Sequence, residues 1–194
     1  MSRLGLYGGS FDPIHIGHLL LARQALEDLN LDRVIFVPAA GSPFKKRGTA
    51  ASAKDRLAMI ALAIEDQREF EIDPFEVNRK PPSYTIHTAR AYKQSHPKDE
   101  LFFLVGEDHA PTLSKWNDFE ELNRLVRFVI LSRSDAPLRT DYPLVRRRLD
   151  ISATEIRKRV ANKLPISYLV PERVFQYIQD NKLYQGEQLL KPRS

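Results

Sequence analysis

Near the start of the chain, an apolar run at residues 4–7 leads into Gly8-Gly9-Ser10-Phe11-Asp12-Pro13-Ile14-His15-Ile16-Gly17-His18, and a helix-like run follows at residues 16–29. Glycines after a strand let the backbone turn sharply and approach a ligand closely, while the start of a helix offers unpaired N–H groups and a positive dipole end. His15 and His18 are three positions apart, so in a first helical turn their rings share one face. The segment therefore predicts a phosphate-binding loop with two imidazoles beside it.

Each part of this segment also has a simpler explanation. A glycine pair after a strand is often only a turn, Asp12-Pro13 is an ordinary turn dipeptide, and a histidine at a helix start is often a cap or a surface residue. The segment is not a Walker A loop, because no Gly-Lys-Ser/Thr follows, and it lacks the Gly-x-Gly-x-x-Gly spacing of dinucleotide-binding loops. The combination is far less common than its parts, so we favour the functional interpretation.

Strand-like and helix-like runs alternate along the chain. Runs rich in Val, Ile, Leu or Phe, typical of buried parallel strands, lie at residues 4–7, 34–37, 101–105 and 128–131. Apolar residues at helical spacing lie at residues 16–29, 54–65 and 85–95. This order predicts an α/β fold with a Rossmann-like, doubly wound parallel sheet, in which ligands bind beyond the carboxyl ends of the strands. The candidate motifs follow such ends, at residues 8–18, 38–46 and 106–108.

A second segment, Ile151-Ser152-Ala153-Thr154-Glu155-Ile156-Arg157, has two explanations. Ser152 followed by Glu155 is a capping-box pattern, which by itself marks only the start of a helix. A helix N-terminus with two hydroxyls and an arginine one turn in also suits triphosphate oxygens. Paired with the first loop, this segment would clamp a polyphosphate between two helix ends.

The composition bounds the class of protein. With 194 residues, of which 42% are hydrophobic, the chain can bury one sizeable core, so we expect a single domain over residues 1–194 with a small C-terminal helical portion. The absence of cysteine excludes disulfides and thiolate zinc sites. No apolar run reaches membrane-spanning length and no signal-peptide pattern precedes the first strand, so the default expectation is a cytoplasmic protein without a membrane partner.

The formal net charge of +5 suits polyanions without choosing among them. The basic clusters at residues 45–47 and 146–148 lack the interleaved aromatic residues that single-strand nucleic-acid binders use. A solvated face or a small phosphorylated ligand explains them better, so we expect no nucleic-acid partner. The sequence does not decide whether the protein forms a homo-oligomer.

Both motifs are similar to those of a known superfamily. Residues 10–18 resemble the (T/S)-F-D-P-x-H-x-G-H signature of the nucleotidyltransferases with the H-x-G-H motif, and residues 151–157 resemble their I-S-S-T-x-I-R motif, with Ala153 in place of the second serine. Within this superfamily the chain resembles the bacterial nicotinate-nucleotide adenylyltransferases over nearly its whole length. Supporting stretches are Val37-Pro38, Pro43-Phe44-Lys45, residues 81–88, Gly106-Glu107-Asp108 with Trp116, and residues 169–184.

The resemblance implies a transfer of the adenylyl group of ATP to nicotinate mononucleotide, giving deamido-NAD and pyrophosphate. A phosphate is already a competent nucleophile, so such an enzyme mainly positions two polyanions and neutralises charge in the transition state. The catalytic residues that it implies are His15, His18, Lys45 and Arg157. We expect Mg²⁺ to accompany ATP, bound mainly through phosphate oxygens and water, because the sequence offers no dense carboxylate cluster for a metal cage.

The resemblance also divides the remaining site residues between the two substrates. For ATP and its phosphates it implies Gly8, Gly9, Ser10, Phe11, Gly106, Asp108, Ser152 and Thr154. For nicotinate mononucleotide it implies Tyr84, Thr85, Trp116 and Arg133. Packing is the alternative role for Phe11 and Trp116, and helix capping is the alternative for Asp108.

The chain departs from the family pattern at several positions. Phe44 stands where a histidine is common, His87 where an acidic or amide residue is common, and Asn117 where an aromatic residue often follows the tryptophan. Residues 134–135 are Ser-Asp where Pro-Gly is common. The last two departures touch the region that holds the pyridine nucleotide, so the choice between nicotinate and nicotinamide acceptors stays open.

Two alternative functions remain. One is a sister enzyme, either phosphopantetheine adenylyltransferase or a cytidylyltransferase, which the chain length and the Tyr84 and Trp116 region disfavour. The other is a nucleotide- or RNA-binding protein without catalysis, which the retained His15 and His18 disfavour, because a mere binder needs only the positive loop.

Overall fold

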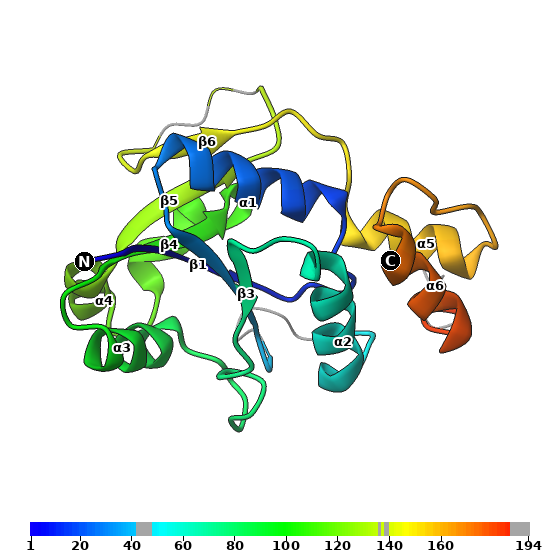
Figure 1. Ribbon diagram of the computed structural model, residues 1–194, viewed down its shortest axis with the longest axis horizontal. Helices are drawn as coiled ribbons and strands as arrows, with labels where there is room; N and C mark the ends of the chain where they lie inside the picture. Colours follow the sequence, from blue (N-terminus) through cyan, green and yellow to red (C-terminus); the bar gives the residue numbers. More distant parts are fainter. Residues whose placement is uncertain (42–47, 136, 138–139, 187–194) are drawn as a thin grey trace.

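The computed structural model describes residues 1–41, 48–135, 137 and 140–186 (Figure 1). Over these residues its centre is a six-stranded sheet with the order β3-β2-β1-β4-β5-β6, and all neighbouring strands are parallel. The strands are β1 (Arg3–Gly9), β2 (Arg33–Pro38), β3 (Phe70–Ile72), β4 (Glu100–Gly106), β5 (Arg127–Ser132) and β6 (Leu144–Arg146). The predicted doubly wound α/β fold is confirmed. The strand order reverses between β1 and β4, where such sheets bind their ligands.

Helices cover both faces of this sheet. They are α1 (Ile16–Asp28), α2 (Ala53–Ile64), α3 (Thr85–Ser95), α4 (Phe119–Leu125), α5 (Ala153–Ala161), α6 (Glu172–Asp180) and the 3₁₀-helix η1 (Glu107–Lys115). One buried apolar cluster joins α1, α2, α5 and α6 to one face, and a second joins α3, α4 and η1 to the other. Figure 1 shows α1 on the opposite side of the sheet from α3 and α4.

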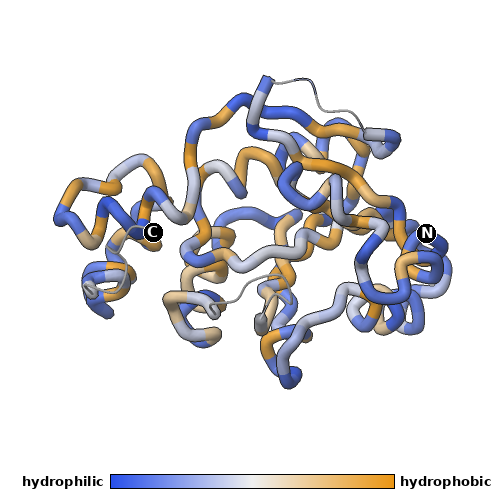
Figure 2. Tube along the Cα trace, turned by 180° about the vertical axis from the view of Figure 1, so that it is seen from behind, coloured by the Kyte–Doolittle hydropathy of each residue, from blue (hydrophilic) through white to orange (hydrophobic). Residues whose placement is uncertain are grey.

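The central strands are continuously apolar because both of their faces are covered. In β1, Leu6 belongs to the cluster with α3, whereas Tyr7 belongs to the cluster with α1 and α2. In β4, Phe103 and Leu104 divide in the same way. Figure 2 shows the hydrophobic colour gathered in the central strands, with hydrophilic residues along the outer turns. This double burial removes the alternation that a half-exposed strand would show.

The four strands predicted from the sequence correspond to β1, β2, β4 and β5, and the three predicted helices correspond to α1, α2 and α3. The predicted C-terminal helical portion consists of α5 and α6. The sequence did not predict β3, β6, α4 or η1. The strands β3 and β6 are three residues long and lie at the two edges of the sheet, which is too short for a recognisable apolar run.

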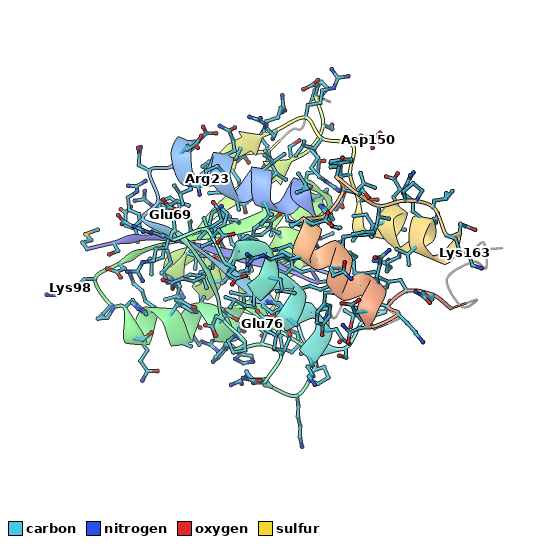
Figure 3. All side chains as sticks on the ribbon, turned by 45° about the vertical axis from the view of Figure 1, so that its right-hand side comes forward. Arg23, Glu69, Glu76, Lys98, Asp150 and Lys163 are labelled. Atoms are coloured by element: carbon cyan, nitrogen blue, oxygen red, sulfur yellow. The ribbon has the colours of Figure 1, made fainter. Side chains whose placement is uncertain are left out.

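The C-terminal portion packs back onto the body of the molecule. Figure 3 shows α6 lying beside α2, and close backbone contacts join the two helices. Val174 and Ile178 of α6 are buried in the same apolar cluster as Met59 and Ile60 of α2. Within the described ranges, each helix is too short or too polar to cross a lipid bilayer.

Candidate active site

The chain leaves β1 through a turn that Phe11 shapes. Phe11 has a positive φ of 46°, and its buried ring packs edge-on against Tyr7, Phe36 and His18. A Cβ on Gly9 would lie 2.9 Å from this ring, so a larger residue there would displace a packed aromatic side chain. Phe11 therefore sets, by packing, the path of residues 8–18, which we call the phosphate loop after their predicted role.

The two histidines of the loop stack on each other at the start of α1. Their ring centroids are 3.7 Å apart with an angle of 21° between the planes, and His15, the N-cap residue, is 2% exposed. The backbone N–H of His15 donates to Nδ1 of His18 at 3.2 Å. A neutral His18 ring therefore carries its proton on Nε2, which leaves that N–H as its donor.

Both imidazoles are neutral at pH 7 in the free protein. Burial, reinforced by the charge of Arg133, lowers the pKa of His15 to about 3. Burial also lowers the pKa of His18 well below its usual value, and His15 and Arg133 act in the same direction. An anionic phosphate beside the rings would oppose these effects. The pair therefore offers N–H donors at first, and it can take up positive charge when negative charge arrives.

We expect the free energy of unfolding to fall as the pH drops below about 6.5, because histidines of the unfolded chain then bind protons that folded His15 and His18 do not. This stability is present above the unfolded pKa and is lost as the pH falls toward the folded pKa. Each such histidine contributes a slope of about 1.4 kcal/mol per pH unit in that window. Urea denaturation of the wild type and of His15→Gln would measure it. The variant should have the shallower slope, and equal slopes would contradict the assignment.

Two charged residues that the sequence did not mark as functional hold the loop in place. The Asp12 carboxylate accepts the backbone N–H groups of Ala50 at 2.7 Å and of Ala51 at 3.0 Å. The Arg56 guanidinium, 1% exposed, donates to the carbonyl of Ser10 at 2.7 Å. Burial lowers the pKa of Arg56, and the charge of Asp12 opposes that effect. The sequence did contain one indication of this role, because Arg56 occupies a core-facing position of the helix predicted at residues 54–65.

A cavity of about 760 Å³ lies between the end of β5 and the start of α5. Its lining residues are Glu107, Arg133, Ser134, Asp135, Arg148, Leu149, Asp150, Ile151 and Ser152. Arg133 donates through Nη1 to the carbonyl of Ile151 at 2.6 Å, and a Cβ on Gly17 would lie 3.7 Å from Ile151. This cavity therefore adjoins the histidine pair. We call it the β5–α5 cavity.

The start of α5 reaches across to the phosphate loop. Ser152 caps the helix by accepting the N–H of Glu155 at 3.1 Å, as the capping-box pattern predicted. Arg157 donates through Nη1 to the carbonyl of Asp12 at 2.6 Å and through Nη2 to the hydroxyl of Thr154 at 3.2 Å. The two sequence motifs are thus joined by a direct hydrogen bond across 145 positions of the chain.

A second cavity, of about 360 Å³, lies beside the phosphate loop on the α3 and η1 side of the sheet. It brings together Tyr84, Thr85 and Trp116, three of the residues that the resemblance gave to the acceptor. The other lining residues are Gly8, Gly9, Ser10, Ala39, Glu76, Ser83, Phe103, Val105, His109, Lys115 and Asn117. The volume falls within the usual range for small-molecule sites, about 300–1,000 Å³. We call this space the Trp116 cavity.

A buried carboxyl group anchors one wall of the Trp116 cavity. Glu76, labelled in Figure 3, is 7% exposed and accepts the hydroxyl of Thr88 at 2.8 Å. Burial raises the pKa of Glu76, while hydrogen bonds from Thr88 and Ser83 oppose that effect. The Ser83 hydroxyl in turn accepts the N–H of Ala40 at 2.9 Å. Glu76 thus ties the loop before α3 to the chain that leaves β2, a role that the sequence did not indicate.

The comparisons with known proteins agree in one family. The family model described as Cytidylyltransferase-like matches residues 6–159. The probable nicotinate-nucleotide adenylyltransferase of Methylacidiphilum infernorum is 48% identical over 187 residues, which cover 94% of this chain and 92% of that protein. The nicotinate-nucleotide adenylyltransferase of Bacillus subtilis is 37% identical over 189 residues, covering 96% of this chain and all of that one. The chain belongs to the nicotinate-nucleotide adenylyltransferases.

A solved structure with the same fold is the Plasmodium falciparum nicotinic acid mononucleotide adenylyltransferase complexed with NaAD. It matches with a TM-score of 0.79 at 20% identity and covers 95% of this chain and 98% of its own. At 20% identity, this structural similarity supports the fold and not the function. Its coverage of 95% of this chain extends the shared fold beyond residues 6–159, which the family model matches.

The adenylyltransferase motifs converge in space, but some predicted residues lie elsewhere than expected. Arg133, which the resemblance gave to the acceptor, lines the β5–α5 cavity instead of the Trp116 cavity. Gly106 ends β4, and Asp108 after it is exposed. The neighbouring Glu107 lines the β5–α5 cavity. Lys45 lies outside the described residues.

Proposed function

We propose that this adenylyltransferase binds ATP in the β5–α5 cavity and nicotinate mononucleotide in the Trp116 cavity, with the histidine pair between them. The observation that best supports this proposal is the position of the histidine pair. On one side, His18 contacts the ring of Phe11, and the neighbouring Gly8, Gly9 and Ser10 line the Trp116 cavity. On the other side, Gly17 lies beside Ile151 of the β5–α5 cavity. Two substrates placed in these spaces would meet beside the stacked imidazoles.

In the proposed reaction, an oxygen of the mononucleotide 5′-phosphate forms a bond to the α-phosphorus of ATP. The bond from that phosphorus to the oxygen bridging to the β-phosphate breaks, and pyrophosphate leaves with the electron pair. The attacking phosphate needs no activated side-chain nucleophile. His15 and His18 would donate N–H groups to the reacting phosphoryl group, and Arg157 would add a fixed positive charge beside the loop.

The remaining assignments follow the same division. Ser152 and the N-terminus of α5 would face the triphosphate, and Trp116 would stack on the pyridine ring. Mg²⁺ would enter as part of the ATP substrate, coordinated mainly by phosphate oxygens and water. We also propose a cytoplasmic location, which cell fractionation tests, and light scattering measures whether the protein forms a homo-oligomer.

Incubating the protein with ATP, Mg²⁺ and nicotinate mononucleotide is expected to give deamido-NAD and pyrophosphate in equal amounts. Mass spectrometry of the small molecules measures the products, and intact-mass spectrometry of the protein tests for a covalent step. Phosphopantetheine and CTP, offered in parallel, test the sister activities. Absence of dinucleotide would refute the proposed function, and a trapped adenylylated protein would refute the direct attack.

A further inference from the structure

Tyr184, near the C-terminal end of the described chain, reaches into the phosphate loop. Its hydroxyl donates to Oδ1 of Asp12 at 2.9 Å, and both side chains are buried, at 7% and 5% exposure. The Tyr184 backbone has a φ of 65°, a left-handed conformation that is uncommon for an aromatic residue and persists only where surrounding contacts hold it. The bond joins positions 172 apart, so it exists only because α6 packs back beside α2, as Figure 3 shows.

Asp12 is the point through which this contact can affect the reaction. Its carboxylate also accepts the N–H groups of Ala50 and Ala51, shortly before α2. Its carbonyl accepts Arg157, whose Nη1 lies 4.0 Å from Oδ2 of the same aspartate. A rotation of the Asp12 side chain would therefore change the 4.0 Å contact between its carboxylate and the Arg157 guanidinium, and it would release the N–H groups of Ala50 and Ala51.

We propose that Tyr184 is a positioning residue for adenylyl transfer, acting through Asp12 on Arg157. The proposal rests on the proposed function. A carboxylate only accepts hydrogen bonds, so each donor on it fixes its orientation, and a buried carboxylate that loses a donor is free to turn toward another. Burial and the neighbouring Asp12 raise the pKa of the Tyr184 phenol, so the hydroxyl remains a donor throughout the neutral range.

The chain contains a matched control for this contact. Tyr177, on α6, donates its hydroxyl to Oδ1 of Asp55 at 3.0 Å. Asp55 lies in the first turn of α2, next to the capping Ser52, and not in the phosphate loop. Both bonds thus fasten the C-terminal portion to the body through a tyrosine and an aspartate. The two bonds differ in their acceptor: Asp12 belongs to the loop that carries the histidines, and Asp55 does not.

The experiment compares Tyr184→Phe with Tyr177→Phe in the full chain, using steady-state assays with ATP and nicotinate mononucleotide. Each change removes one hydroxyl. Tyr184→Phe should lower kcat about tenfold and leave both KM values within about twofold, because the contact orients groups that act on the reacting phosphates. Tyr177→Phe should leave kcat within about twofold. Thermal melts of both variants measure how much the loss of each hydroxyl destabilises the fold.

A double-mutant cycle with Asp12→Asn tests the route of the effect. If Tyr184 acts through Asp12, adding Tyr184→Phe to Asp12→Asn should change kcat by less than about twofold. Equal kcat values in Tyr184→Phe and the wild type would overturn the proposal, and so would equal losses in both tyrosine variants. Should Tyr184→Phe melt below the assay temperature, the same comparison of kcat is made at a temperature below both melting points, where equal losses in the two tyrosine variants overturn the proposal. An inactive wild type would instead refute the proposed function.

Discussion

His18→Ala is expected to lower kcat by about two or more orders of magnitude while leaving the KM for ATP within several-fold. The Nδ1 atom of His18 is occupied by the backbone N–H of His15, so Nε2–H is the donor that remains for a phosphate. The stacked His15 ring and the start of α1 fix the direction of that donor. A fixed donor costs no reorganisation when charge develops, so its loss acts on the transition state more than on ground-state binding.

The control for this variant is His96→Ala. His96 is an exposed histidine at the C-terminal end of α3, where it stacks on Tyr92. It should retain wild-type kcat and KM values, which excludes a general effect of losing one histidine. Because the His15 N–H loses its acceptor in His18→Ala, circular dichroism and a thermal melt must accompany the kinetics. A folded His18→Ala protein with wild-type turnover would show that the ring is only structural.

The sequence predicted the parts of the fold that burial dictates. The strands β1, β2, β4 and β5 each begin with a charged residue and continue as a run without charged residues, because helices cover both faces of the sheet. Such runs are visible without any tertiary information. The unpredicted elements lack that signal. The 3₁₀-helix η1 contains Pro111, which favours a loop assignment, and β6 contributes one buried residue, Val145. Tertiary pairing, not local preference, makes these segments regular.

The same reasoning separates the predicted part of the site from the part that was missed. Most of the residues that we propose to face the substrates belong to compact motifs after strands, so local patterns mark them. Residues that hold those motifs in place have partners far along the chain: Asp12 with Tyr184, and Glu76 with Thr88. Two adjacent carboxylates, Glu107 and Asp108, also cannot be told apart from local sequence alone. Glu107, rather than Asp108, accepts the Ser132 hydroxyl at 2.6 Å, which depends on the position of β5.

The protein is expected to use nicotinate mononucleotide more efficiently than nicotinamide mononucleotide, by about tenfold to a hundredfold in kcat/KM. The Trp116 cavity is lined by Lys115 and, at the N-terminus of α3, by Thr85. Donors and a positive helix end favour a carboxylate. A carboxamide turns its NH₂ group toward those donors, and an unpaired polar group costs about 1–3 kcal/mol. Asn117 in the same cavity offers a carbonyl to the amide, which limits the preference.

Kinetics with both acceptors would measure this preference in the wild type, Lys115→Gln and Thr85→Val. Lys115→Gln should lower kcat/KM for the acid about tenfold and hardly change the value for the amide, because the charge acts on the carboxylate alone. Lys98→Gln, in the exposed turn before β4, is the matched control and should change neither value. Thr85→Val removes a donor to the carboxylate, so it should lower kcat/KM for the acid more than for the amide. If the wild type used both acceptors equally, the departure at Asn117 in the Trp116 cavity would have removed the discrimination, and the enzyme would serve both routes to the dinucleotide.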